Sequence, residues 1–487
     1  MNGSSDRFLI IKAPWVLGRD GQWMENASIL WDSSSGVVVD VFASRCMSCR
    51  ANARHPQEEG REIPHFAWDD KREGLGMTAS PCHSEASLSS TVVPSVSEAS
   101  PRILDLDGMA VIPGLVNAHT HLELSALSGL FQEISPGDYL GWVRKLMFKR
   151  NTLSEWEIYE AFADAAKKCA DEGTAIVGDV SNIPLVQYFN AENRENLPWR
   201  YLFWEWIGFT VMSIRQLSPK ASRAHARHPQ EEGRGSLTSF GMTALSNGKT
   251  WVDQFSIVSH AVYSTSAYLI KKTKDWCKKR GRIFSIHVGE TEEERKLIEE
   301  GKGAWKEFLE ELGKWDNEWK PPGTTPVRYL ENLGALDENT LLVHCLHLRP
   351  DDWDAIRKNQ CTVCLCPRSN HKLGVGAIPA REILNRRISF LIGTDSLASS
   401  PSLNIFEEAV FLLEHYPIFD PHSVLKAVTG EGYRFFMKTE TPFVEAGFRG
   451  KMLAVSISPG VGIKELSEDV LYNGLKGAFS WIPTALK

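Results

Sequence analysis

The stretch Val111-Ile-Pro-Gly-Leu-Val-Asn-Ala-His-Thr-His-Leu-Glu-Leu124 decides the fold. It is apolar on both sides of Pro113-Gly114 and leads into His119-Thr120-His121. In an extended strand, residues i and i+2 point to the same face, so the two imidazoles converge on one side. Two convergent neutral imidazoles are the beginning of a metal site, but the His-x-His pattern alone is short and common. Further ligands must therefore come from the rest of the chain.

The composition is that of an ordinary globular protein. The 487 residues are 43% hydrophobic and 24% charged, which suits a large α/β barrel with an accessory domain. A net charge of -7 without a basic stripe argues against a nucleic-acid partner. No apolar run approaches the roughly 20 residues that span a bilayer, and the polar segment 1–6 is unlike a signal peptide. Nine scattered cysteines indicate reduced thiols, so we expect a cytoplasmic protein with no membrane partner.

Short apolar runs separated by turn residues predict a small β unit at the start of the chain. These runs cover 8–11, 27–31 and 37–42. A later run, 452–457, follows a turn and is expected to return to them. We therefore predict a small β-sandwich domain built from both chain ends, and its three pieces are 1–43, 102–112 and 436–487.

Two segments do not fit any regular pattern. Segment 44–101 is rich in Ser, Arg, Glu and Pro without periodicity, and we expect it to be a disordered insertion. Nine of its residues, 53–61, recur at 226–234, inside a second insertion at about 219–249. We interpret the repeat as one short element inserted twice into tolerant loops. Its role stays open.

Between residues 113 and 435, apolar runs alternate with amphipathic stretches, which predicts a (β/α)₈ TIM barrel. The best-marked helix begins at the capping box Ser154-Glu-Trp-Glu157 and is expected to end at Gly173. After the first strand, which ends at Asn117, the predicted strands are 174–179, 201–207, 256–260, 283–287, 341–344, 361–365 and 388–395.

Polar residues stand at the carboxyl ends of these strands, where such a barrel carries its active site. They are His119, His121, Asp179, Glu205, His260, His287, His344 and Asp395. Repeated polar residues at the ends of apolar strands indicate one shared polar site. For Asp179 and Glu205, a strand end that faces solvent is an equally good interpretation.

The pattern resembles the amidohydrolase superfamily, and within it the cytosine deaminase and chlorohydrolase-like branch. That branch includes the methylthioadenosine, adenosylhomocysteine and aminofutalosine deaminases. The matching motifs follow the family's order and are specific only in combination. They are Pro113–Glu123, Ser259–Ser264, His287–Glu290, His344–Leu348, Cys366–Asn370 and Gly393–Ser399.

The resemblance implies a metal site. His119, His121 and His287 look like three ligands, and Asp395 looks like the fourth ligand and the proton acceptor from metal-bound water. No lysine stands at the end of the fourth barrel strand, so a carboxylated-lysine bridge between two metals is not expected. We expect one divalent ion, Zn²⁺ first, with Fe²⁺ open as the alternative.

The resemblance also implies the remaining site residues. Glu290 looks like the acid that protonates a ring nitrogen, and His344 looks like the hydrogen-bond partner of the attacking hydroxide. The expected substrate contacts are His260, Glu123, Trp142 and Asn370. For Glu123, a role in holding a loop stays open. Of Trp142, Trp204 and Trp206, we expect two to pack between strands and helices rather than to line the pocket.

The implied activity is hydrolytic deamination of an amino-substituted N-heterocycle with release of ammonia. An adenine nucleoside is the leading small-molecule substrate. One alternative is hydrolysis of another C–N or C–Cl bond by the same site, as for guanine or a triazine. Another is a catalytically inactive relative that acts as a scaffold, against which the intact ligand set argues. A homodimer is left open.

Overall fold

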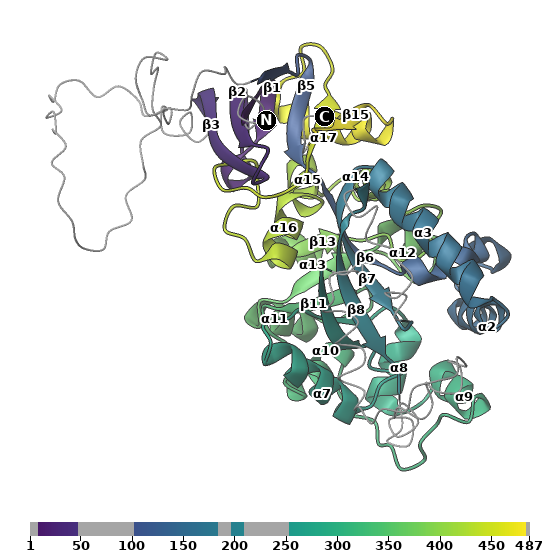
Figure 1. Ribbon diagram of the computed structural model, residues 1–487. Helices are drawn as coiled ribbons and strands as arrows, with labels where there is room; N and C mark the ends of the chain where they lie inside the picture. Colours follow the sequence, from purple (N-terminus) through teal and green to yellow (C-terminus); the bar gives the residue numbers. More distant parts are fainter. Residues whose placement is uncertain (1–7, 47–101, 184–195, 209–252, 484–487) are drawn as a thin grey trace, which may run out of the picture.

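The computed structural model describes residues 8–46, 102–183, 196–208 and 253–483 (Figure 1). The second predicted insertion, at about 219–249, lies outside the described residues. The first does too, apart from its beginning, because strand β3 (Val37–Cys46) extends beyond the predicted boundary at residue 43.

One seven-stranded sheet gathers strands from both ends of the described chain. Its strands are β1 (Phe8–Leu17), β2 (Trp23–Asp32), β3, β4 (Arg102–Asp105), β5 (Met109–Pro113), β14 (Met452–Ser456) and β15 (Phe479–Trp481). The order is β15-β14-β5-β1-β2-β3, with β4 also beside β1. In β1, Leu9, Ile11 and Ala13 are buried at alternate positions, as a strand with one covered face requires. A second facing sheet, which the predicted sandwich needs, is not found among the described residues.

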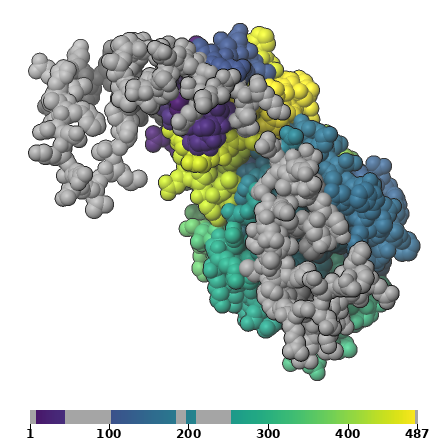
Figure 2. Space-filling model, viewed as in Figure 1, coloured from purple at the N-terminus to yellow at the C-terminus, as the bar shows by residue number. Residues whose placement is uncertain are grey.

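The carboxyl-terminal strand β14 pairs antiparallel with β5, and Met452 stands opposite Pro113. The two ends of the chain, purple and yellow, therefore lie together at one end of the molecule (Figure 2). Pro113 and Gly114 separate this sheet from β6 (Leu115–Thr120), which belongs to the larger part of the fold.

The larger part contains two four-stranded parallel sheets among the described residues. The first joins β6, β7 (Thr174–Ser181), β8 (Trp199–Trp206) and β9 (Gln254–Ser259). The second joins β10 (Phe284–Val288), β11 (Thr340–His344), β12 (Thr362–Leu365) and β13 (Phe390–Ile392). Parallel bridges connect the two sheets at both junctions, Ala261 to His287 and Thr120 to Asp395. The hydrogen-bonded neighbours thus run in a circuit, and the α/β class is confirmed.

Helices surround this circuit of strands (Figure 1). Both faces of the strands are covered, which is why β6 and β7 are buried along their whole length. The helices are α2 (Tyr139–Arg150), α3 (Glu155–Asp171), α7 (Ala267–Lys278), α8 (Glu292–Glu300), α9 (Ala304–Glu311), α10 (Pro326–Asn332), α11 (Pro350–Lys358), α12 (Pro367–Leu373), α13 (Ala380–Asn385), α14 (Ile405–His415), α15 (Pro421–Ala427), α16 (Gly430–Met437) and α17 (Ile463–Leu475). Short 3₁₀ turns cover Arg19–Gly21, Leu122–Leu127 and Leu130–Glu133. No helix in these described ranges is both long and apolar enough to cross a bilayer.

The best-marked helix of the sequence is confirmed. Ser154 caps α3, and its hydroxyl and the Glu157 carboxylate form the reciprocal bonds of a capping box. Gly173 follows the helix with a φ of 87°, a left-handed conformation that favours glycine. Helices α8 and α9 were not predicted, because the charges of segment 290–320 hide the few apolar residues that they bury.

Candidate metal centre and pocket

The candidate metal centre begins where β6 meets β13. The backbone N–H groups of Thr394 and Asp395 both donate to the His119 carbonyl oxygen, at 3.0 Å each. This pairing brings the Asp395 carboxylate beside the imidazoles of the predicted His-x-His pair. Asp395 Oδ1 lies 3.8 Å from His119 Nε2 and 3.6 Å from His121 Nε2. The second oxygen, Oδ2, accepts hydrogen bonds from Ser369 (2.6 Å) and Ser399 (2.9 Å), so Oδ1 is left facing the histidines.

The position of Asp395 beside the histidines depends on close backbone contact at Gly393 and on left-handed backbone at Asp395 itself. A Cβ atom at Gly393 would lie 2.7 Å from the His119 carbonyl oxygen, so only glycine lets β13 approach β6 here. Asp395 has a φ of 60° and His344, at the end of β11, has a φ of 74°. Such left-handed conformations of non-glycine residues cost on the order of 1–3 kcal/mol each and cluster at functional sites.

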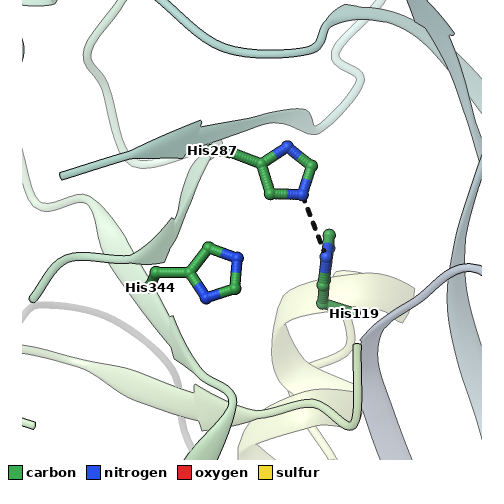
Figure 3. Close-up of side chains that lie close together, drawn as sticks. All are labelled: His119, His287 and His344. Carbon is green, nitrogen blue, oxygen red and sulfur yellow. Dashed lines mark hydrogen bonds between the residues drawn. The ribbon is translucent and has the colours of Figure 1, made fainter. Parts of the chain in front are cut away.

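His287, on β10, completes the convergence. Its Nδ1 lies 3.0 Å from the carbonyl oxygen of His260, an acceptor, so the His287 proton is on Nδ1 and a lone pair is on Nε2. That Nε2 lies 3.2 Å from His119 Nε2, and both rings point into one space that His344 also faces (Figure 3). Ligand atoms of His119, His121 and Asp395 lie within 4.8 Å of one another.

The donor set suits a divalent cation. Burial lowers the pKa of His119, His121 and His287, so these imidazoles are neutral and can each offer a lone pair. The Nδ1 atom of His119 is buried without a hydrogen-bond partner among the described residues. Nitrogens bound to one tetrahedral Zn²⁺ lie about 3.3 Å apart, close to the 3.2 Å between His119 and His287. A cation bound here would accept the nitrogen lone pairs that otherwise face one another.

Glu290 and His344 lie on the other side of this space. Glu290 Oε1 is 3.5 Å from His344 Nε2, and burial raises the pKa of the Glu290 carboxyl. His344 Nδ1 lies 2.9 Å from the side-chain oxygen of Asn370. That oxygen is an acceptor, so His344 donates to it from Nδ1 and turns Nε2 toward Glu290. Asn370, which we expected to contact substrate, lies behind His344 and not on the pocket wall.

These groups open into a cavity of about 570 Å³. Its polar lining includes His121, His287, Asp395, Glu290, His344 and His260. His260 is held by a 2.6 Å hydrogen bond between its Nδ1 and Ser264, and burial lowers its pKa to about 3. Apolar side chains, including Leu146, Phe308 and Leu309, line the same cavity. The cavity therefore combines the candidate metal ligands with apolar walls.

Trp142 is the member of the three tryptophans that lines this cavity, and its indole N–H donates to the carbonyl oxygen of Ala398 at 3.0 Å. Trp204 and Trp206 contact one another edge to face, and neither lines the cavity. This agrees with the expectation that two of the three serve packing.

Glu123 lines the cavity with both carboxylate oxygens engaged. Oε1 accepts from Arg150 at 2.8 Å, and Oε2 accepts from the Ser181 hydroxyl at 2.6 Å. The backbone N–H groups of Asn182 and Ile183 also donate to Oε2. Glu123 therefore holds the segment after β7, the second of the two roles left open for it, and a direct substrate contact stays a prediction.

Asp179 and Glu205 have different surroundings. Asp179 is paired with Arg200, both fully buried, and it accepts the Leu122 N–H, so it braces the turn after His121. Glu205 lines the cavity 3.6 Å from His287 Nδ1, and burial raises its pKa to about 8. Both residues are buried, so the alternative of a strand end that faces solvent is wrong. Sequence reasoning left Glu205 open as a site residue and did not select Tyr139. Glu205 was signalled by its place at a strand end, whereas nothing in the sequence distinguishes Tyr139.

Comparison with known proteins identifies the family of this chain. The model of the amidohydrolase family matches residues 110–456, which is more than half of the chain. The chain belongs to the amidohydrolase family, whose members are hydrolases. The aminodeoxyfutalosine deaminase of Deinococcus radiodurans is 28% identical over 346 residues, which are 70% of this chain and 76% of that protein.

Two solved structures share the fold. Helicobacter pylori aminofutalosine deaminase in complex with methylthio-coformycin has a TM-score of 0.68 at 16% identity, over 95% of this chain and 96% of that one. Atrazine chlorohydrolase from Arthrobacter aurescens, complexed with zinc, has a TM-score of 0.62 at 15% identity, over 94% of this chain and 91% of that one. At these identities the likeness concerns the fold alone.

Proposed function

We propose that this amidohydrolase removes an amino group from an N-heterocycle, with an adenine nucleoside as its leading substrate, and releases ammonia. One observation carries the proposal. Three neutral imidazoles and the Asp395 carboxylate converge at one end of a cavity in which Glu290 and His344 face them. The similarity to an aminodeoxyfutalosine deaminase supports the same reaction. We further propose that the circuit of parallel strands is a closed (β/α)₈ barrel whose carboxyl-terminal face carries the site.

His119, His121, His287 and Asp395 would hold the ion, and three imidazoles with one carboxylate suit Zn²⁺. Bound there, a divalent ion supplies Lewis acidity and lowers the pKa of water to about 7. The chain's contribution is orientation. The His260 carbonyl fixes the tautomer of His287, and the two serines turn Asp395 Oδ1 toward the histidines.

Glu290 is the proposed acid. Attack on an aromatic carbon is easier when the neighbouring ring nitrogen receives a proton in the same step. Burial raises the pKa of Glu290, which keeps a larger fraction of the carboxyl protonated near neutral pH. Its O–H bond breaks as the ring N–H bond forms. Asp395 accepts one proton of the attacking water and passes it to the departing amine, and the second proton of that water returns to Glu290 as the C=O bond forms.

His344 and His260 are proposed to orient the reactants. The bond from His344 Nδ1 to Asn370 leaves Nε2 to hydrogen-bond the attacking oxygen. His260 stands on the cavity wall with its Nδ1 held by Ser264, leaving Nε2 for the substrate. The cavity of about 570 Å³ is large for a single ring, and its apolar lining suits a substrate with a substituent. Trp142 and Glu123 are proposed to contact that substituent.

The test combines metal analysis with ammonia release. Purified protein is expected to contain about one divalent ion per chain and to release ammonia from an adenine nucleoside within a panel of aminopurines and aminopyrimidines. Asp107→Asn, an exposed turn residue of the small sheet, serves as the matched carboxylate control and should keep wild-type activity. Metal-loaded protein that releases no ammonia from any member would refute the proposal. Chloride release from chlorinated rings would then favour C–Cl hydrolysis.

A further inference from the structure

Glu290 has two oxygens with different partners. Oε1 is turned toward His344, at 3.5 Å from its Nε2. Oε2 accepts a hydrogen bond from the Tyr139 hydroxyl at 2.7 Å. The backbone beside it is fixed separately, because the Glu294 carboxylate accepts the N–H groups of Gly289 (2.8 Å) and Glu290 (3.1 Å). The Tyr139 bond therefore acts on the carboxyl group itself, not on the loop that carries it.

Tyr139 is held in a fixed position. It is the first residue of α2, which Asp138 caps by accepting the Gly141 N–H. Its ring packs against Trp142 at 5.6 Å and against Trp305 at 6.0 Å between ring centroids. Burial raises its pKa well above the ordinary value, so its hydroxyl stays a hydrogen-bond donor across the working pH range.

A second tyrosine packs beside the first. Tyr263 also lines the cavity, and its ring stacks on Trp305 at 4.1 Å between ring centroids. Trp305 therefore contacts both tyrosine rings and helps to fix the position of Tyr139.

We propose that Tyr139 is a positioning residue that decides which oxygen of Glu290 carries the transferable proton. The inference rests on the proposed deamination by Glu290. A neutral carboxyl has one O–H donor and one carbonyl oxygen that accepts. Since Tyr139 donates to Oε2, the proton of neutral Glu290 resides on Oε1, the oxygen turned to His344 and the cavity. Without the tyrosine, either oxygen can carry the proton and the carboxyl can rotate.

The first experiment uses Tyr139→Phe, which removes the hydroxyl and keeps the ring that packs against the two tryptophans. General acid catalysis contributes about 10²- to 10⁴-fold to a rate, and loss of orientation should remove part of it. We expect kcat to fall about 10- to 100-fold with little change in KM. The alkaline limb of the pH profile should move to higher pH, because the lost donor stabilised the Glu290 carboxylate. His344, Asp395 and His347, the other titratable groups that act on Glu290, stay in place.

The second experiment tests whether the effect belongs to the hydroxyl that bonds Glu290. Tyr263→Phe removes the neighbouring hydroxyl and keeps the ring that stacks on Trp305, so it should lower kcat less than Tyr139→Phe. Tyr268→Phe, at a half-exposed position on α7, is the matched control and should change neither kcat nor the pH profile. A loss of kcat in Tyr263→Phe as large as in Tyr139→Phe, or wild-type kcat in Tyr139→Phe, would overturn the inference.

An infrared measurement separates this inference from the proposed function, because it needs no turnover. The carboxyl bands of Glu290 are assigned in zinc-loaded protein from the difference spectrum against Glu290→Gln. They should shift in Tyr139→Phe and stay unchanged in Tyr268→Phe. Shifted bands in a protein that releases no ammonia would refute the deaminase proposal and keep the positioning. Unshifted bands in an active deaminase would refute the positioning alone.

Discussion

Asp395→Asn removes one negative charge from the candidate metal centre and preserves the shape of the side chain. The choice of asparagine follows from the backbone, because residue 395 has a φ of 60°. Asparagine adopts this left-handed conformation more readily than alanine, so the substitution adds little strain. Ser369 and Ser399 can still donate to the amide oxygen, as they now donate to Asp395 Oδ2. The fold should therefore survive the exchange.

The chemical effect should be large. With its oxygen held by the two serines, the new amide points N–H groups toward His119 and His121, where Oδ1 now lies 3.8 and 3.6 Å from their Nε2 atoms. A donor cannot bind a cation or accept a proton. Loss of a general base alone lowers a rate about 10²- to 10⁴-fold, or about 2.7–5.4 kcal/mol of transition-state stabilisation. We expect at least this loss in kcat, together with weaker metal retention.

The assay measures ammonia release, bound metal and the thermal melt on the same preparations. Ser399→Ala serves as the comparison, because it removes one bond that orients Asp395 and leaves the charge. Its loss of activity should be about tenfold or less. Asp395→Asn with kcat within tenfold of wild type and a normal metal content would refute the assignment of Asp395 as base and ligand. Loss of the cooperative thermal melt would instead show that asparagine is not tolerated in the left-handed conformation of residue 395.

Three further outcomes are expected. Burial raises the pKa of Glu290, and this acid works only when it is protonated, so kcat should fall as the pH rises through that pKa. In a pH–rate profile, Glu290→Gln should lower kcat about 10²- to 10⁴-fold and abolish this alkaline limb. A chelator should abolish activity and lower the melting temperature, and added Zn²⁺ should restore both, since a ligand at 100 times its Kd stabilises the folded state by about 2.7 kcal/mol. Asp179→Ala takes the carboxylate partner from the fully buried Arg200 and should lower the free energy of unfolding in urea by about 3–5 kcal/mol; a change below about 1 kcal/mol would contradict this.

The sequence predicts the strands because their patterns are local. Apolar runs that end in a histidine or an aspartate mark β6, β10, β11 and β13 within a few residues. Once these strands are placed side by side, their polar ends must meet, which is why the convergence of His119 with Asp395 follows without coordinates. Helix α8 was missed for the opposite reason. The side of α8 that faces the core is short, and its charged residues form ion pairs such as Lys296 with Glu293.

The surroundings of the metal ligands could not be predicted, because they depend on contacts between distant segments. Arg150 reaches Glu123 from the end of α2, and Tyr139 reaches Glu290 from its beginning. The two pairs are 27 and 151 residues apart in the chain, and no spacing rule links a helix terminus to its partner in either case. Asn370 shows the same limit, since its motif indicated the site but not that its amide would support His344.

The backbone strain and the neutral imidazoles of the site bear on how the fold and the ion depend on each other. Buried imidazoles and left-handed backbone at His344 and Asp395 oppose folding, whereas imidazoles that stay neutral favour binding of a cation. The free energy that holds these groups in place must come from elsewhere, and the buried strands with their covering helices supply it. An ion that binds only the folded state then returns part of that free energy. The scaffold is therefore expected to assemble the site before the ion arrives, and the ion is expected to stabilise a structure already formed.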